Sequence, residues 1–343
     1  SYNPIKAFTI LLEARAENAR KRKELLSLFS RANDLLGRLE KEESRLLPLS
    51  GRSIRRTMEH HIDQLKRENV HILVAGETSA GKSSLINLIL GEEVLPSNFL
   101  PTTSAICELK YGKERQIVLH YKEADSTKEK RQETFGFVDP AELQKYVGGA
   151  KQKKCSNYEK IEIFLPHQLL EKGIAIVDSP GIGETKHMTE MVTEYLTQAL
   201  AFVYVINTPN SGGVKEDRIE ELLQSTMRKV FEKIHEDLPQ GSQNEPLENE
   251  FQSNCALFLC NKWEYVLNNE DANPDEVKED VIRKLKNCWP GLVTEDQVFF
   301  MSVKDAKKAA KDGRVSDDFV NFMNSMGSMI FKSCKTRLEI HWR

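Results

Sequence analysis

The residues with the clearest chemical meaning are 76–83, whose sequence is Gly-Glu-Thr-Ser-Ala-Gly-Lys-Ser. They fit the pattern G-x-x-x-x-G-K-[ST], in which backbone N–H groups surround phosphates. In that pattern Lys82 reaches the β- and γ-phosphates and the Ser83 hydroxyl ligates Mg²⁺. The apolar runs 70–75 and 84–90 predict a buried strand before the loop and a helix after it. Because a helix N-terminus favours anions, this setting predicts a site for a nucleoside triphosphate.

A second motif, D-x-x-G, ends the apolar run 174–178. Asp178 at the end of this predicted strand is expected to reach Mg²⁺ through a water, and the Gly181 N–H to contact the γ-phosphate. Loss of that phosphate would release the segment that follows, which is the behaviour of a nucleotide switch. The motif is weak alone, and its position after a phosphate loop strengthens it.

Two adjacent threonines, Thr102 and Thr103, lie between these motifs. Nucleotide switches supply a threonine to Mg²⁺ from this part of the chain. We select Thr103 as that ligand, with Thr102 as the close rival. The predicted magnesium ligands are therefore Ser83, Thr103 and Asp178.

A third motif concerns the base. Residues 261–264, Asn-Lys-Trp-Glu, are similar to [NT]-K-x-D, whose carboxylate accepts hydrogen bonds from guanine N1–H and N2–H. Adenine lacks that donor pair, so the motif favours GTP. Glu264 is one methylene longer than the usual Asp. Further on, the run 298–304 ends in Ser302 and Lys304, in the place of a loop that backs the base.

Composition limits the remaining possibilities. The 343 residues, 39% of them hydrophobic, suffice for one large core and a smaller unit. A net charge of −3 provides no basic field, so we expect no nucleic-acid partner. No apolar run reaches the length of a membrane span. Six cysteines without metal-ligand spacing suit a reducing compartment.

Hydrophobic periodicity predicts the layout of the chain. Helices are expected over 5–45, 53–67 and 317–342. Between the second and the third of these helices, strands alternate with helices. The near-continuous apolar character of the strands predicts a mostly parallel sheet. The expected strands are 70–75, 105–111, 117–121, 161–164, 174–178, 202–207, 255–261 and 298–302.

The fold class that follows is α/β, a P-loop GTPase domain flanked by a helical bundle made from the two chain ends. The predicted units are 1–68, 69–314 and 315–343, with the last helix packing on the first ones. The alternative is that each terminal helix packs separately on the α/β core.

The order of the motifs resembles the dynamin superfamily of large GTPases, most closely the mitofusin and bacterial dynamin-like branch. The resemblance covers roughly residues 70–304 and rests on 76–87, 94–97, 102–103, 178–181 and 261–264. It implies a truncated GTPase domain with the root of a helical stalk. The membrane would then be reached through parts missing from this chain, and the full-length protein would be cytoplasmic and membrane-associated.

The resemblance also implies a mechanism, in which two copies form a homodimer across their nucleotide faces. Ser79 would help to hold K⁺ or Na⁺ against the bridging oxygen, and Thr103 would hold the attacking water. Dynamins proper place a glutamine before that serine, where this chain has Thr78. The loop 210–218 falls where the family contacts its partner's nucleotide; the alternative for this loop is a solvated turn.

The predicted function is GTP binding and dimerisation-stimulated hydrolysis that drives membrane fusion, fission or tethering. One alternative is a GTP-regulated assembly module with negligible hydrolysis. Another is an ATPase of the Eps15-homology-domain class, against which Asn261 and Lys262 argue. The predicted catalytic residues are Ser79, Lys82 and Thr103. The predicted nucleotide-binding residues are Glu77, Thr78, Ser79, Ala80, Gly81, Lys82, Ser83, Ser84, Thr102, Thr103, Asp178, Gly181, Asn261, Lys262, Glu264, Ser302 and Lys304.

Overall fold

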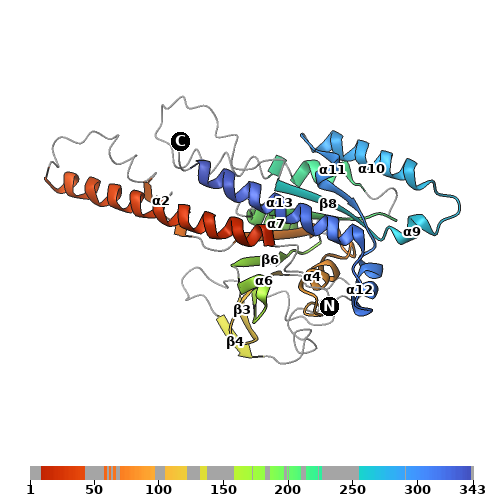
Figure 1. Ribbon diagram of the computed structural model, residues 1–343, viewed down its shortest axis with the longest axis horizontal. Coiled ribbons are helices and arrows are strands. Elements are labelled where there is room, and N and C mark those ends of the chain that lie inside the picture. Colours follow the sequence, from red (N-terminus) through yellow and green to blue (C-terminus); the bar gives the residue numbers. More distant parts are fainter. Residues whose placement is uncertain are drawn as a thin grey trace.

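The computed structural model shows an α/β domain with two long helices beside it (Figure 1). It describes residues 9–42, 58–59, 62, 65–66, 70–96, 105–121, 132–136, 158–171, 173–181, 186–196, 199, 201–209, 214–222, 224–225, 255–289 and 291–340. Thr102, Thr103 and most of the expected helix 53–67 lie outside these residues, as does the start of the loop 210–218.

A nine-stranded sheet forms the centre of the described structure, in the order β4-β3-β5-β2-β6-β1-β7-β8-β9. From β5 to β2, and from β6 through to β9, neighbouring strands pair in parallel. The pairs β2–β6, β3–β4 and β3–β5 are antiparallel. The predicted mostly parallel sheet is thus confirmed. The strands are β1 (Val70–Gly76), β2 (Ile106–Tyr111), β3 (Gln116–Tyr121), β4 (Gln132–Gly136), β5 (Tyr158–Leu165), β6 (Ile174–Asp178), β7 (Ala201–Asn207), β8 (Ala256–Asn261) and β9 (Val298–Phe300).

The central strands are buried on both faces, which explains their continuous apolar sequences. In β1, Ile72 and Val74 belong to one hydrophobic cluster, and Leu73 and Ala75 to the other. Successive side chains of a strand point to opposite faces, so each strand serves two cores.

Helices cover both faces of the sheet. The face that carries Ile72 packs against α4 (Lys82–Leu90), α12 (Val303–Lys311) and α13 (Asp317–Ile340). The opposite face packs against α7 (Lys186–Leu196) and α10 (Pro274–Cys288). Shorter helices are α6 (Gln168–Glu171), α9 (Glu264–Leu267) and α11 (Thr294–Gln297).

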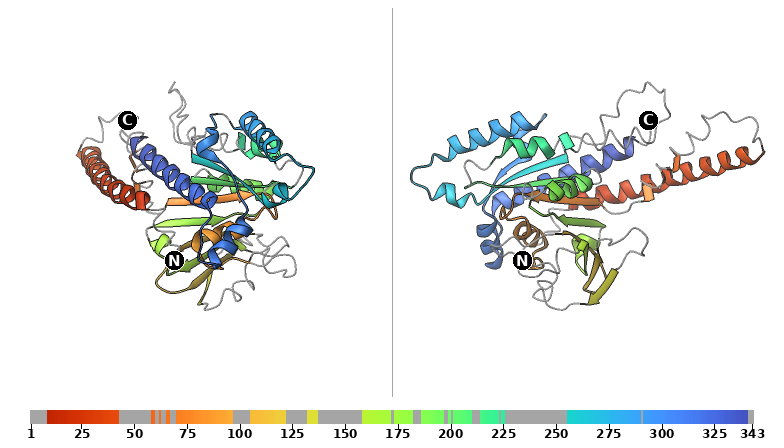
Figure 2. Two further views of the ribbon diagram at one scale, coloured as in Figure 1. Left: turned by 45° about the vertical axis from the view of Figure 1, so that its right-hand side comes forward. Right: turned by 180° about the vertical axis from the view of Figure 1, so that it is seen from behind.

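The two ends of the chain pack together. The long helix α2 (Thr9–Glu42) contacts α13, and the two run side by side in all three views (Figures 1 and 2). The first half of α13 also belongs to the sheet core, because Phe319, Phe322 and Met326 lie in the same cluster as β1. The last helix therefore contacts both α2 and the sheet, and the three predicted units stay predictions. Among the described residues, no helix combines the length and apolar character needed to cross a membrane.

Candidate nucleotide-binding site

The phosphate loop is shaped by two glycines for which no other residue has space. A Cβ on Gly76 would lie 2.1 Å from the Val205 oxygen of β7, and a Cβ on Gly81 would lie 2.2 Å from Asn261 Nδ2. Gly81 has a φ of 100° and Ser79 a φ of 60°, both in the left-handed region. The loop therefore closes tightly between β1 and α4, as a phosphate cradle requires.

Lys82 lies folded back over this loop and is almost fully buried. Its Nζ donates to the Gly76 oxygen at 3.1 Å and to the Glu77 oxygen at 2.9 Å. A buried ammonium needs such partners. A phosphate in the loop would offer stronger, charge-assisted acceptors to the same group.

The end of β6 meets the start of α4 through a direct contact between Ser83 and Asp178. Ser83 Oγ donates to Asp178 Oδ2 at 2.7 Å. Asp178 is fully buried, and its Oδ1 has no hydrogen-bond partner within the described part of the chain. Burial raises the pKa of Asp178 to about 6, although Lys82 and the Ser83 hydroxyl act in the opposite direction.

These oxygens fit Mg²⁺. The cation prefers a few protein oxygens with water and phosphate completing its shell, and the unpaired Asp178 Oδ1 lies beside the Ser83 hydroxyl. The third predicted ligand, Thr103, is outside the described residues. Where the chain is described, no group of three or more His, Cys, Asp or Glu side chains could hold a metal.

The D-x-x-G motif ends directly against the phosphate loop. A Cβ on Gly181 would lie 2.1 Å from Thr78 Oγ1 and 2.8 Å from Thr78 N, so only glycine fits there. The Thr78 hydroxyl is buried and makes no hydrogen bond to any described residue. The structure thus brings together the motifs that the sequence placed about the γ-phosphate.

Asn261 links the base-side motif to the phosphate loop. Its Nδ2 donates to the Ala80 oxygen at 2.7 Å, and its Oδ1 accepts from Lys262 N at 2.7 Å and from Val303 N at 3.0 Å. One buried amide therefore fixes the loop, the end of β8 and the start of α12. Its contacts within the chain use both ends of the amide group.

The other residues of the predicted base-binding motifs differ in their burial and in their hydrogen-bond partners. Glu264 begins α9, and its Oε2 is buried without a partner in the described structure. Burial lowers the pKa of Lys262 despite the opposing charge of Glu264. The Ser302 hydroxyl accepts from Asp305 N at 3.0 Å as the N-cap of α12, whereas Lys304 is exposed.

Lys215 and Arg218 belong to the predicted loop 210–218, and both contact the phosphate loop. Lys215 Nζ lies 3.2 Å and Arg218 Nη1 lies 3.1 Å from Oε1 of the nearly buried Glu77. The segment after β7 therefore holds the phosphate loop within one chain. β1 pairs in parallel with β7, so the carboxyl ends of both strands lie at one edge, where the two loops meet.

Comparison with known proteins agrees with this geometry. Residues 72–231 match the family model described as the dynamin family. The Bacterial dynamin-like protein of Nostoc punctiforme is 28% identical over 212 residues, which are 61% of this chain and 27% of that protein. Transmembrane GTPase Marf of Drosophila melanogaster is 23% identical over 259 residues, which are 71% of this chain and 27% of that protein. Mitofusin-2 of Rattus norvegicus is 25% identical over 267 residues, which are 71% of this chain and 29% of that protein.

The resemblance drawn from the motifs is confirmed. Residues 72–231 match the dynamin family, and the relatives named above lie in its mitofusin and bacterial dynamin-like branch. It spans less than a third of the length of each of these relatives. A solved bacterial dynamin pair aligns with 93% of this chain and 46% of its own, at 17% identity and a TM-score of 0.49, a likeness too weak to carry functional meaning.

Proposed function

We propose that the α/β domain binds GTP with Mg²⁺ and hydrolyses it to GDP and phosphate, and that hydrolysis is stimulated when two copies meet through their nucleotide faces. The observation that carries the proposal is the contact of Ser83 with Asp178. Two motifs 95 residues apart meet at 2.7 Å, with one carboxylate oxygen left unpaired. That is an arrangement for a ligand, since a buried polar atom is otherwise costly to leave unsatisfied.

Different residues of the chain would bind different parts of the nucleotide. Lys82 and the loop N–H groups bind the phosphates, Gly181 N–H senses the γ-phosphate, and Asn261 with Glu264 reads the base. Mg²⁺, when bound, neutralises charge that develops on the phosphates. Ser83, Asp178 and Thr103 would hold it.

The family implies two further parts. Ser79, which holds a left-handed backbone in the loop, would help to bind K⁺ or Na⁺, and Thr103 would position the water. One relative is named a transmembrane GTPase, which supports hydrolysis and membrane association for the longer protein. In that protein α2 and α13 would transmit the nucleotide state to the parts that remodel the membrane.

The decisive experiment measures GTP turnover per molecule in potassium buffer with Mg²⁺, over protein concentrations spanning about a hundredfold. Assembly by mass action predicts a specific rate that rises with concentration. A tight GTP complex with a flat rate near zero would contradict stimulated hydrolysis. Competition with ATP in the same assay tests the base, because ATP should not displace GTP.

That flat outcome would favour the alternative of a GTP-regulated assembly module. The observation behind this alternative is Thr78, whose short hydroxyl stands where dynamins proper have a glutamine and is buried without a partner among described residues. Thr78→Gln would then be expected to raise turnover. Failure to do so would leave Thr78 without a role in the slow rate.

The choice between the two threonines has its own test. Thr103→Ala should spare GTP binding and reduce turnover about a hundredfold, because it removes a group expected to act only near the transition state. Thr102→Ala is the matched control. If Thr102→Ala has the larger effect, the metal and water ligand is Thr102.

A further inference from the structure

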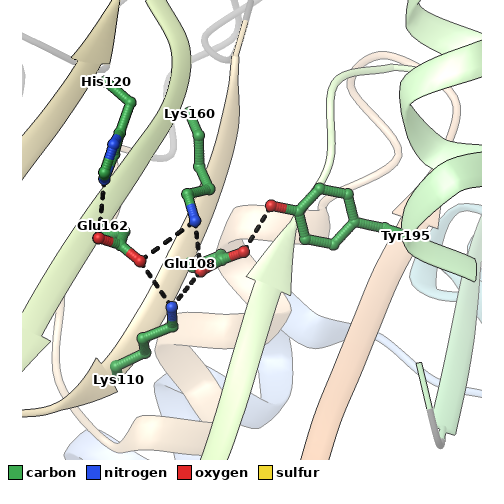
Figure 3. Close-up of polar contacts among 6 residues, drawn as sticks. All are labelled: Glu108, Lys110, His120, Lys160, Glu162 and Tyr195. Carbon is green, nitrogen blue, oxygen red and sulfur yellow. Dashed lines mark hydrogen bonds and ion pairs between the residues drawn. The ribbon is translucent and has the colours of Figure 1, made fainter. Parts of the chain in front are cut away.

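A network of charged side chains lies on one face of β2, β3 and β5, and it begins one residue along β2 from Cys107, the strand partner of Asp178 (Figure 3). The face is the one that α7 covers. Ile106 of β2 belongs to the same hydrophobic cluster as Val192 of α7, and Glu108 and Lys110 follow Ile106 at steps of two residues. Along β2, the apolar core on this face is therefore followed by charged residues.

Two glutamates and two lysines saturate one another in this network. Lys160 Nζ lies 3.4 Å from Glu108 and 3.2 Å from Glu162, and Lys110 lies 2.7 Å from Glu162 and also contacts Glu108. His120 Nε2 adds a contact to Glu162 at 2.8 Å. These contacts connect side chains of β2, β3 and β5.

Both carboxylates stay ionised in this setting. Burial acts to raise the pKa of Glu108, but the charge and hydrogen bond of Lys110 outweigh it, so the pKa is lowered. Burial opposes a similar effect at Glu162, where hydrogen bonds from Lys110 and His120 lower the pKa to about 2. Glu108 is therefore a fixed negative acceptor.

Tyr195 of α7 is the residue that uses this acceptor. Its hydroxyl donates to Glu108 Oε1 at 2.5 Å, and Figure 3 shows the ring reaching from the helix toward the network. Burial and the negative charge of Glu108 raise the pKa of Tyr195, so the phenol remains a donor. Hydrogen bonds to charged acceptors are among the stronger ones in proteins.

The position of Tyr195 on α7 gives this bond its meaning. The helix (Lys186–Leu196) follows the D-x-x-G motif, and Tyr195 is one residue from its end. The acceptor strand is also tied to the switch strand, because Cys107 pairs with Asp178. The bond therefore holds the C-terminal end of α7, whereas the N-terminal end lies closer in sequence to Gly181.

We propose that Tyr195 is a positioning residue that pins the C-terminal end of α7 to the sheet, so that the N-terminal end turns about a fixed point when the nucleotide changes. This inference rests on the proposed GTP switch at Asp178 and Gly181. The charged network holds Glu108, the acceptor at the fixed end of the helix. Without it, movement after Gly181 would shift the whole helix instead of rotating it.

Amide hydrogen exchange of α7 tests the proposal in the unaltered protein. With GDP and with a non-hydrolysable GTP analogue, exchange at residues 193–196 should be the same, while exchange at 188–190 should differ. Equal nucleotide dependence at both ends of the helix would overturn the pivot.

Tyr195→Phe tests the bond itself, and Tyr121→Phe is the matched control. Tyr121 also donates its hydroxyl to a glutamate, Glu133 at 2.9 Å, but on the β3–β4 hairpin. Tyr195→Phe should speed exchange at 193–196 about tenfold and lower kcat severalfold with KM within about twofold. Tyr121→Phe should do neither. Equal behaviour of the two variants would overturn the proposal.

A further variant separates the tyrosine bond from the ion pairs of Glu108. Glu108→Gln keeps an oxygen acceptor for Tyr195 while breaking the pairs with Lys110 and Lys160, so exchange at 193–196, taken relative to exchange of the sheet strands in the same variant, should rise less than in Tyr195→Phe. A larger rise would contradict the assigned bond. If the wild-type chain neither binds nor hydrolyses GTP, the proposed function fails; exchange in nucleotide-free Tyr195→Phe still reports whether the anchor exists.

Discussion

Two buried carboxylates on neighbouring strands behave in opposite ways. Asp178 of β6 is fully buried and Glu108 of β2 is 4% exposed, and the residue next to Glu108 pairs with Asp178 across the strands. Burial raises the pKa of Asp178 to about 6, whereas the pKa of Glu108 is lowered. Burial is common to both, so the difference arises from their partners.

The two carboxylates differ in how many partners they have. Glu108 accepts from Tyr195 and contacts two lysines, while Asp178 accepts from one hydroxyl and keeps one oxygen unpaired. We expect the paired Glu108 to stabilise the sheet against loss of any one partner, and the unpaired oxygen of Asp178 to lower stability unless the proposed Mg²⁺ is bound. Ligand sites commonly sacrifice stability in this manner.

The largest expected effect comes from replacing a lysine in each of the two regions by alanine. Lys82→Ala should lower GTP affinity at least about a hundredfold, because the loop loses its charge-assisted phosphate contact. Lys110→Ala should leave affinity within about twofold but lower the free energy of unfolding by about 3 kcal/mol, because two glutamates lose a partner. Nucleotide titration and denaturant unfolding of both variants measure this. Normal GTP affinity in Lys82→Ala would refute the phosphate-loop assignment.

Neutralising the two carboxylates should change stability with opposite signs. In the nucleotide-free protein at pH 7, Glu108→Gln should lower the free energy of unfolding by about 2–3 kcal/mol, because it breaks a buried pairing. Asp178→Asn should raise it by about 1–2 kcal/mol. A pKa change from 3.8 to about 6, which already includes the attraction of Lys82, sets an upper limit of about 3 kcal/mol for this gain. The same sign in both variants would break the comparison.

The smallest expected effect is the pH dependence of the stability gained by Asp178→Asn. The folded-state pKa of Asp178 is raised, so its contribution to stability is present below about 3.8 and is lost as pH rises through about 6. The advantage of Asp178→Asn over wild type should therefore be close to zero at pH 4 and reach its full value by pH 7. Unfolding curves at several pH values measure it.

Glu162 supplies the converse control. Its pKa is lowered to about 2, so its stabilising contribution is present above its ordinary pKa of 4.5 and is lost only as pH falls toward 2. In a His120→Asn background, which removes the titratable neighbour 2.8 Å from Glu162, the difference made by Glu162→Gln should stay constant between pH 5 and 7. A drift there as large as that of Asp178→Asn would show that the pH effect is not specific to the nucleotide site.

Several elements could be predicted because a local rule governs them. The runs 70–75, 174–178 and 202–207 predicted β1, β6 and β7 to within a residue, since strands buried on both faces must be continuously apolar. β4 (Gln132–Gly136) was not predicted, because this polar strand pairs with β3 and carries no apolar run. The roles of the predicted site residues remain predictions, although the structure brings Ser83 to Asp178 and Asn261 to the phosphate loop.

The sequence by itself indicated the family and the central strands and predicted the nucleotide class, because phosphate loops and buried strands depend on residue types at short, fixed spacing. Only the tertiary structure decided which charges meet. Lys160 lies 52 residues from Glu108 along the chain, and Arg218 lies 141 from Glu77. The order of strands in the sheet sets such contacts, and with them the direction in which each buried pKa moves.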